Sequence, residues 1–226
     1  MKKQDIKPGR IIPIVLYYEE PGYFDSTMKC LTASGLNRDT IIVTREGVGS
    51  MSKAFNEGVL KAGGEFLPSD YLLWITNVSF DPKLPFQMLS QMQADNKIAA
   101  IHATHKSDHI HLQSKAYKEI PFIELTMAMF SGVALNDVGG MDEQMPYWGM
   151  DLDWSYRARQ KQYKLAVSGT PEVKHTYLRH STRNNPRMVH PISVIRERLR
   201  ALRDTQTLQA LTKKYGTNWK QKLWPV

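Results

Sequence analysis

Residues 10–18 read Arg10-Ile-Ile-Pro-Ile-Val-Leu-Tyr-Tyr18, a short apolar and β-branched run typical of a buried strand. Three further runs of this kind lie at residues 40–44, 71–76 and 97–102. Helical patterns separate the four runs, at residues 24–34, 51–62 and 84–95. Strands that alternate with helices predict an α/β domain in which helices cover both faces of a mostly parallel sheet.

In such a sheet, ligands bind beyond the carboxyl ends of the strands. The residues at or just beyond the four strand ends are Tyr18 and Glu19, Arg45, Asn77 and Ser79, and His102. We therefore expect the functional site at this edge of the sheet. Ser50 is the expected N-cap of the second helix, which starts from the same edge.

The second half of the chain has a weaker pattern. We predict a strand pair, or one strand after a turn, over residues 123–135 and a loop over 136–149. A helix over 150–162 and a strand over 164–168 follow. A long amphipathic helix is predicted over 191–214, with an apolar stripe that includes Leu208 and Leu211. We divide the chain into a catalytic domain, residues 1–182, and a basic helical extension, residues 183–226.

The net charge of +8 is unevenly distributed over the 226 residues. From residue 175 onward, eleven Lys and Arg stand against Glu197 and Asp204, a net charge of +9, so the preceding residues carry −1. This asymmetry indicates an arm that meets a polyanion such as DNA or an anionic membrane surface. A helix with a solvated basic face explains the same charge.

Composition excludes several classes of protein. Hydrophobic residues make up 42% of the chain, and no window approaches 18 consecutive apolar residues, which excludes a transmembrane segment. The single cysteine, Cys30, excludes an intramolecular disulfide and a multi-thiolate zinc site. The basic N-terminus lacks a small-residue cleavage site, so we do not expect a signal peptide. We expect a cytoplasmic protein.

Residues 139–159 hold the densest group of chemistry-bearing side chains. Carboxylates surround a Gly139-Gly140 turn and the start of a predicted helix, and aromatic residues flank them: Asp142, Glu143, Asp151, Asp153, Tyr147, Trp148 and Trp154. The helix dipole alone favours acids in a first turn. However, aromatic faces commonly bind sugar rings, and a glycine pair admits a ligand close to the backbone.

This motif resembles the family-2 glycosyltransferases, which have the nucleotide-sugar-binding GT-A fold. The family shows Gly-Gly-Phe-Asp-Glu, then Glu-Asp-x-Asp at the start of a helix that ends in Arg-Ala-Arg. This chain has Gly139-Gly-Met-Asp-Glu143, Met150-Asp-Leu-Asp153 and Arg157-Ala-Arg159. Weaker similarities lie, in the family's order, at residues 12–19, 47–58, 131–135, 173–182 and 213–216. The resemblance covers most of residues 11–182 and implies a single GT-A-like domain.

The resemblance implies an inverting transfer from a nucleoside-diphosphate sugar to an acceptor hydroxyl, with Asp151 as the general base. The residues expected at the nucleotide sugar are Tyr18, Glu19, Arg45, Lys53, Asn56 and Asn77. Those expected at the acceptor or the sugar are Trp148, Asp153 and Glu124. Asp153 is also expected to orient Asp151, Arg157 or the helix start. Glu124, in an apolar segment, is either a buried, satisfied residue or an acceptor contact.

One departure from the family concerns the metal. Members usually carry an acidic Asp-x-Asp motif after the third strand, and here Asn77 and Ser79 stand in place of the acids. Neutral oxygens are weaker ligands for Mg²⁺ or Mn²⁺ than carboxylates. Either Asn77, Ser79 and His175 hold the metal together with the diphosphate, or the metal is dispensable. In the second case Lys53, Arg45 or Arg179 would neutralise the leaving group.

The acceptor has two candidate classes. The basic C-terminal quarter suits DNA that bears a hydroxylated base, because Lys and Arg neutralise phosphates in any sequence. A saccharide or a lipid-linked glycan at an anionic membrane surface explains the same charge. A different hypothesis for the function is a module that binds a nucleotide sugar but is catalytically inactive. The missing acidic motif favours it.

Overall fold

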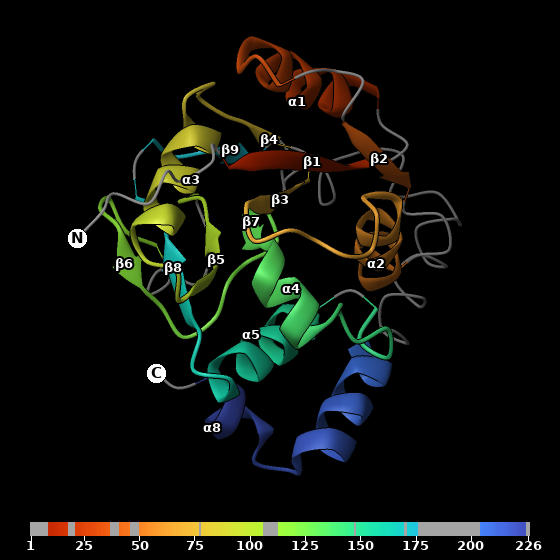
Figure 1. Ribbon diagram of the computed structural model, residues 1–226. Helices are drawn as coiled ribbons and strands as arrows, with labels where there is room; N and C mark the ends of the chain where they lie inside the picture. Colours follow the sequence, from red (N-terminus) through yellow and green to blue (C-terminus); the bar gives the residue numbers. More distant parts are fainter. Residues whose placement is uncertain are drawn as a thin grey trace, which may run out of the picture.

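A seven-stranded mixed sheet lies at the centre of the molecule, with helices on both faces (Figure 1). The computed structural model describes residues 9–17, 21–36, 41–45, 50–76, 78–105, 113–146, 148–169, 171–175 and 204–224, and only the backbone of residues 21–23, 45 and 175. The strand order is β2-β1-β3-β7-β5-β8-β6. This architecture confirms the predicted α/β class with a sheet between helices.

The first half of the sheet follows the predicted alternation of strands and helices. Its elements are β1 (Arg10–Tyr17), α1 (Pro21–Ala33), β2 (Ile42–Arg45), α2 (Met51–Lys61), β3 (Asp70–Ile75), α3 (Leu84–Ala94) and β5 (Ile98–His102). Strands β1, β2 and β3 are parallel, with Ile14 opposite both Ile42 and Trp74. Ser50 caps α2 as predicted, since its hydroxyl accepts a 3.2 Å hydrogen bond from the backbone nitrogen of Lys53.

The second half of the sheet contains antiparallel as well as parallel pairs of strands. Strand β7 (Met127–Ser131) lies antiparallel between β3 and β5. Parallel neighbours need a long crossover, usually a helix, and the described residues between β5 and β7 contain only the short strand β6 (Lys118–Glu119). Strand β8 (Lys164–Val167) runs parallel to β5, and β6 pairs with it at the edge.

Two helices connect β7 to β8. Helix α4 (Gly132–Val138) begins directly at the end of β7, and α5 (Met150–Gln160) follows the glycine turn. The predictions of a strand up to residue 135 and of a loop from residue 136 were therefore wrong, because β7 ends at Ser131 and α4 runs from Gly132 to Val138. Outside the main sheet, β4 (Val78–Ser79) pairs with β9 (Lys174–His175).

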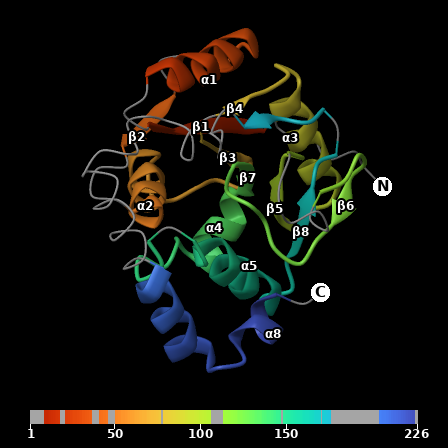
Figure 2. The ribbon, with the colours of Figure 1, turned by 180° about the vertical axis from the view of Figure 1, so that it is seen from behind.

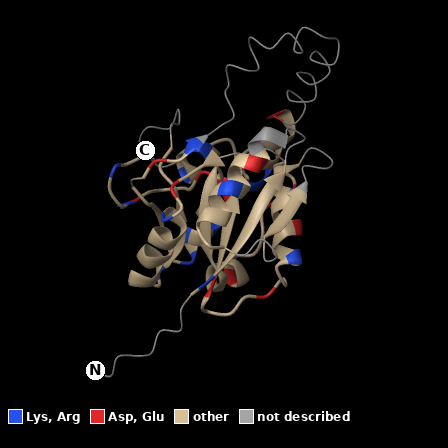
Figure 3. Cartoon of the chain, turned by 90° about the horizontal axis from the view of Figure 1, so that it is seen from above, with Lys and Arg blue, Asp and Glu red and all other residues tan. Residues whose placement is uncertain are grey.

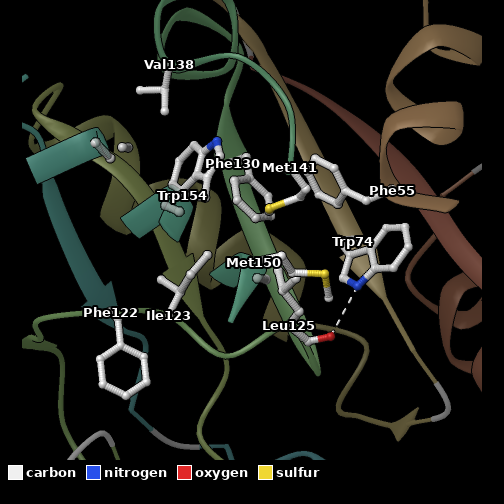
Figure 4. Close-up of a cluster of buried hydrophobic side chains, with 14 of the residues drawn as sticks. Phe55, Trp74, Phe122, Ile123, Leu125, Phe130, Val138, Met141, Met150 and Trp154 are labelled. Carbon is white, nitrogen blue, oxygen red and sulfur yellow. Dashed lines mark hydrogen bonds between the residues drawn. The ribbon is translucent and has the colours of Figure 1, made fainter. Parts of the chain in front are cut away.

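The larger hydrophobic core lies between the sheet and the layer that holds α2, α4 and α5 (Figure 4). At its centre Phe130 of β7 makes edge contacts with Trp154 of α5 and Phe55 of α2, at ring centroid distances of 4.9 Å and 5.2 Å. The indole of Trp74 is fully buried and donates a 3.1 Å hydrogen bond to the carbonyl of Leu125. This packing fixes α5 against the sheet.

The C-terminal helices complete the same core. Residues 204–215 are helical, and α8 is formed by Trp219–Leu223. Both lie beside α5 in the two opposite views (Figures 1 and 2). Leu211 and Leu223 are fully buried in the larger core, whereas Leu208 is 44% exposed, so the predicted apolar stripe was wrong at that position. The helix turns Thr207, Ala210 and Leu211 inward instead.

The predicted domain boundary at residue 182 lies outside the described residues. None of the helices in the part of the chain that the structure describes combines the length and the apolar character that crossing a bilayer requires.

Candidate functional site

The start of α2, the start of α5 and the loop over residues 139–149 meet at one edge of the sheet. Helix α2 follows β2, so its first turn lies at the carboxyl ends of the parallel strands. There the backbone nitrogen of Met51 donates a 2.7 Å hydrogen bond to the carbonyl of Pro146. Helix α5 begins four residues later, after Gly149 in a left-handed conformation with φ of 79°. This arrangement brings Asp151 to the predicted edge.

Asp151 lies in the first turn of α5. Burial raises the pKa of its carboxyl from 3.8 to about 6, and the negative charge of Glu124 adds to the rise. A hydrogen bond from the backbone nitrogen of Leu152, 2.9 Å from Oδ1, opposes it. A carboxylate that titrates near neutral pH is suited to accept a proton from a hydroxyl.

Glu124 lies beside Asp151 and is held by neighbours from the loop after β5. Its side chain is 14% exposed and accepts a 2.6 Å hydrogen bond from Nε2 of Gln113. Nε2 of His105 is 3.4 Å from the same carboxylate oxygen, and burial lowers the pKa of that imidazole. The backbone nitrogen of Glu124 donates to Nδ1 of the fully buried His102, at 2.8 Å. Glu124 is thus largely buried, hydrogen-bonded and close to the candidate base.

Asn56 of α2 holds the Gly139-Gly140 turn by hydrogen bonds. The Asn56 amide accepts from the backbone nitrogen of Met141 at 2.8 Å and donates to the Met141 carbonyl at 2.9 Å. Its second hydrogen reaches Glu143 at 3.0 Å. A Cβ on Gly140 would lie 2.5 Å from Oδ1 of Asn56, which explains the second glycine. Asn56 therefore holds the loop, and its contact with a nucleotide stays a prediction.

Helix α5 holds the same turn from its other side. The Arg157 guanidinium donates to the carbonyls of Val138 and Gly140, the latter at 2.6 Å, and to Asp153 at 2.8 Å. The indole of Trp154 donates a 2.8 Å hydrogen bond to the Gly139 carbonyl. Arg157 is one of the three partners that the sequence offered for Asp153, beside Asp151 and the helix start.

Asp153 and Trp148 are both engaged by helix 204–215. Asp153 is fully buried and accepts hydrogen bonds from Lys214, at 2.6 Å, and from the hydroxyl of Tyr215. The indole of Trp148 donates a 2.7 Å hydrogen bond to Asp204. Contacts of Asp153 and Trp148 with an acceptor or sugar stay predictions.

The sequence assigned no role at the site to Gln113, Asp204, Lys214 or Tyr215. The only signal was the weak similarity of residues 213–216 to a tail found in some family members. Long-range pairs such as Asp153 with Tyr215, which are 62 positions apart, leave no local pattern.

Several predicted nucleotide contacts can be placed only in part. Tyr18, Glu19 and Asn77 lie outside the described residues, and only the backbone of Arg45 is described, at the end of β2. The Lys53 side chain is exposed on the first turn of α2. Lys53 is therefore accessible at the edge where Asp151 lies.

Two of the three predicted metal ligands, Ser79 and His175, lie in the paired strands β4 and β9, and Asn77 lies outside the described residues. Pairing of β4 with β9 sets Val78 opposite His175 and Ser79 opposite Lys174. The Ser79 side chain is the only one of the three that is described, and the residue across from it is a cation. Among the described residues no three His, Cys, Asp or Glu side chains converge on a metal position. Ser79 offers a neutral hydroxyl oxygen, which is a weaker ligand for Mg²⁺ or Mn²⁺ than a carboxylate.

No model of a known protein family matches the sequence, and no curated protein is significantly similar to it. Solved structures share its fold. GalNAc-T7 with UDP, GalNAc and Mn²⁺ superposes with a TM-score of 0.58 at 11% identity, over 76% of this chain and 44% of that one. The catalytic domain of Drosophila β1,4-galactosyltransferase 7 in complex with xylobiose gives 0.55 at 14% identity, over 76% and 72%.

S. aureus TarS, residues 1–349, gives a TM-score of 0.53 at 12% identity, over 73% of this chain and 59% of that one. This chain therefore spans less than two thirds of the GalNAc-T7 and TarS chains. All three structures are GT-A-type glycosyltransferases. The strand order, the helices on both faces and these superpositions agree, and the chain has the GT-A glycosyltransferase fold.

Proposed function

We propose that the protein is an inverting glycosyltransferase with a nucleoside-diphosphate sugar as donor and Asp151 as general base. The acceptor oxygen bonds to the anomeric carbon while the bond to the diphosphate breaks on the opposite side. The diphosphate leaves with the electron pair, and Asp151 takes the hydroxyl proton. The observation that carries the proposal is the position of Asp151, at the sheet edge on the first turn of α5 with a pKa of about 6.

Negative charge grows on the diphosphate during transfer and must be neutralised. We propose that Lys53, Arg45 or Arg179 contributes this charge, and of these the Lys53 side chain is exposed on the first turn of α2. GalNAc-T7 was solved with Mn²⁺, and a divalent ion bound near Asn77, Ser79 and His175 would supply further positive charge to the diphosphate. Rates measured with Mn²⁺ and with EDTA decide whether this protein uses one.

For the acceptor we propose DNA that bears a hydroxylated base. The support is the net charge of +9 from residue 175 onward, which suits a polyanion. Seven of the eleven bases lie at residues 176–203, outside the described residues, and elsewhere charges of both signs are interspersed (Figure 3). Binding to duplex DNA is expected to weaken steeply as salt rises. No binding at low salt would remove DNA as the acceptor.

A saccharide is the alternative acceptor, since the Drosophila enzyme was solved with xylobiose. A lipid-linked glycan at an anionic membrane surface accounts for the basic quarter in the same way. Binding to vesicles with and without phosphatidylserine, measured beside the DNA titration, separates these acceptors from DNA.

The test of the function is nucleotide release and sugar transfer with a panel of nucleoside-diphosphate sugars. Asp151→Asn is expected to lower kcat about 10²–10⁴-fold. Asp25→Asn, an exposed carboxylate on α1, is the matched control and should leave kcat unchanged. Binding of a nucleotide sugar without transfer to any acceptor would instead identify an inactive binding module.

A further inference from the structure

The loop over residues 139–149 and the first turn of α5 are held from outside by helix 204–215. Three of its polar side chains reach back to this region: Asp204 to Trp148, Tyr215 to Asp153, and Lys214 to both Asp142 and Asp153. We propose that helix 204–215 positions this loop and Asp151 for transfer, with Lys214 as the principal positioning residue. The inference rests on the proposed function.

Lys214 joins two carboxylates, Asp142 of the loop and Asp153 of α5. Its ammonium nitrogen is 2.8 Å from Oδ2 of Asp142 and 2.6 Å from Oδ1 of Asp153. Asp153 is fully buried, so its charge must be compensated, and Arg157 and Lys214 supply the two cations. The Lys214 ammonium also lowers the pKa of Asp142, which keeps that partner ionised. The bridge therefore ties the loop to the start of α5.

Packing at Gly149 connects this bridge to Asp151. A Cβ on Gly149 would lie 2.9 Å from Cγ2 of Thr207 and 3.2 Å from Cδ1 of Leu211. Helix 204–215 thus lies against the N-cap of α5, two positions before the candidate base. Because a catalytic group displaced by about 1 Å can lose a hundredfold in rate, this distant helix is able to control transfer.

The polar contacts and the apolar contacts of helix 204–215 hold different atoms of the loop and of the start of α5. Lys214 and Tyr215 fix carboxylates, Asp204 fixes an indole, and Thr207 and Leu211 fix the backbone at Gly149. Loss of Lys214 is therefore expected to loosen the loop while the apolar contacts keep the helix docked.

The experiment compares Lys214→Met with Lys214→Arg and with Lys213→Met in the full chain. Lys213 is an exposed neighbour on the same helix and serves as the matched control. Hydrogen exchange of the peptide over residues 139–149 reports on the loop, and kcat and KM for the donor report on transfer. Melting temperatures identify variants that fail to fold.

We expect Lys214→Met to speed exchange in the loop about tenfold and to lower kcat about tenfold, with the donor KM within twofold. Lys214→Arg should restore both, because a guanidinium can bridge two carboxylates. Exchange equal to that of Lys213→Met would overturn the positioning by Lys214. Faster exchange with unchanged kcat would overturn its role in transfer, while an inactive parent protein would refute the proposed function and leave the exchange result interpretable.

Discussion

Nε1 of Trp148 lies 2.7 Å from Oδ1 of Asp204 and donates a hydrogen bond to it. The Trp148 ring also lies 6.3 Å from the ring of Trp219, between centroids. A residue that the sequence marked as a candidate sugar contact is therefore oriented by side chains more than fifty positions later in the chain. Its environment combines a partly buried indole donor with a carboxylate acceptor, so its fluorescence can report on the bond.

Asp204→Ala is expected to lower the free energy of unfolding by about 1–3 kcal/mol, because it removes a hydrogen bond to a charged acceptor and leaves the indole donor unpaired. The measurement is denaturant unfolding followed by tryptophan fluorescence, with Gln206→Ala, an exposed position on the same helix, as control. Equal stability of the two variants would show that the bond contributes nothing.

Transfer should depend on pH through Asp151. With a pKa of about 6 the carboxyl is protonated below that value and cannot act as a base. We expect kcat to fall about tenfold per pH unit below pH 6 and to be level above it. Glu124→Gln removes a negative charge that raises this pKa, so the acid limb should move to lower pH. A limb that stays in place in Glu124→Gln would contradict the coupling.

The free energy of unfolding should fall as pH rises, whereas kcat should increase. The native state holds the Asp151 proton up to about pH 6, whereas the unfolded chain releases it near pH 3.8. The native state therefore binds more protons in that window, and the free energy of unfolding falls as pH rises through it and is level above pH 6. Asp151→Asn should remove this loss and stabilise the protein by about 1–3 kcal/mol at pH 8, with little effect at pH 3.5. Chemical denaturation at the two pH values is the measurement.

Gly140 and Asn56 should be energetically coupled. Gly140→Ala places a methyl group 2.5 Å from Oδ1 of Asn56, and we expect it to cost about 1–3 kcal/mol of unfolding free energy. In Asn56→Ala the space is free, so the same substitution should cost less in that background. A double-mutant cycle of unfolding free energies measures the difference, and strict additivity would mean that the clash is relieved elsewhere.

Local sequence predicted much of the fold, because strand and helix periods are local. Strands β1, β2, β3 and β5, the helices between them and the Ser50 cap follow from such patterns. Local patterns did not predict that β7 is antiparallel to its neighbours or that α4 starts at Gly132. Both depend on the path by which the chain returns to the sheet. The spacing of apolar residues predicted that Leu208 points inward, whereas in the structure Thr207 is buried against Gly149 and Leu208 is exposed.

The site was predictable as a region but not as a set of contacts. The acids of the motif and the contact of Asp153 with Arg157 follow from short spacings, as two residues four positions apart face one another on a helix. The role of Asn56 as a brace for the glycine turn and the approach of Lys214 to Asp153 involve residues from separate elements. Only the assembled fold brings them together.

The bond from Trp148 to Asp204 spans 56 positions of the chain. At a synthesis rate of about 5–20 residues per second, the loop leaves the ribosome several seconds before its holding helix. In that interval the nascent chain already contains the acids of residues 142–153 but not the helix over residues 204–215 that contacts them. On the proposed positioning role of helix 204–215, the site becomes competent for transfer only late in biosynthesis, after most of the strands have been translated.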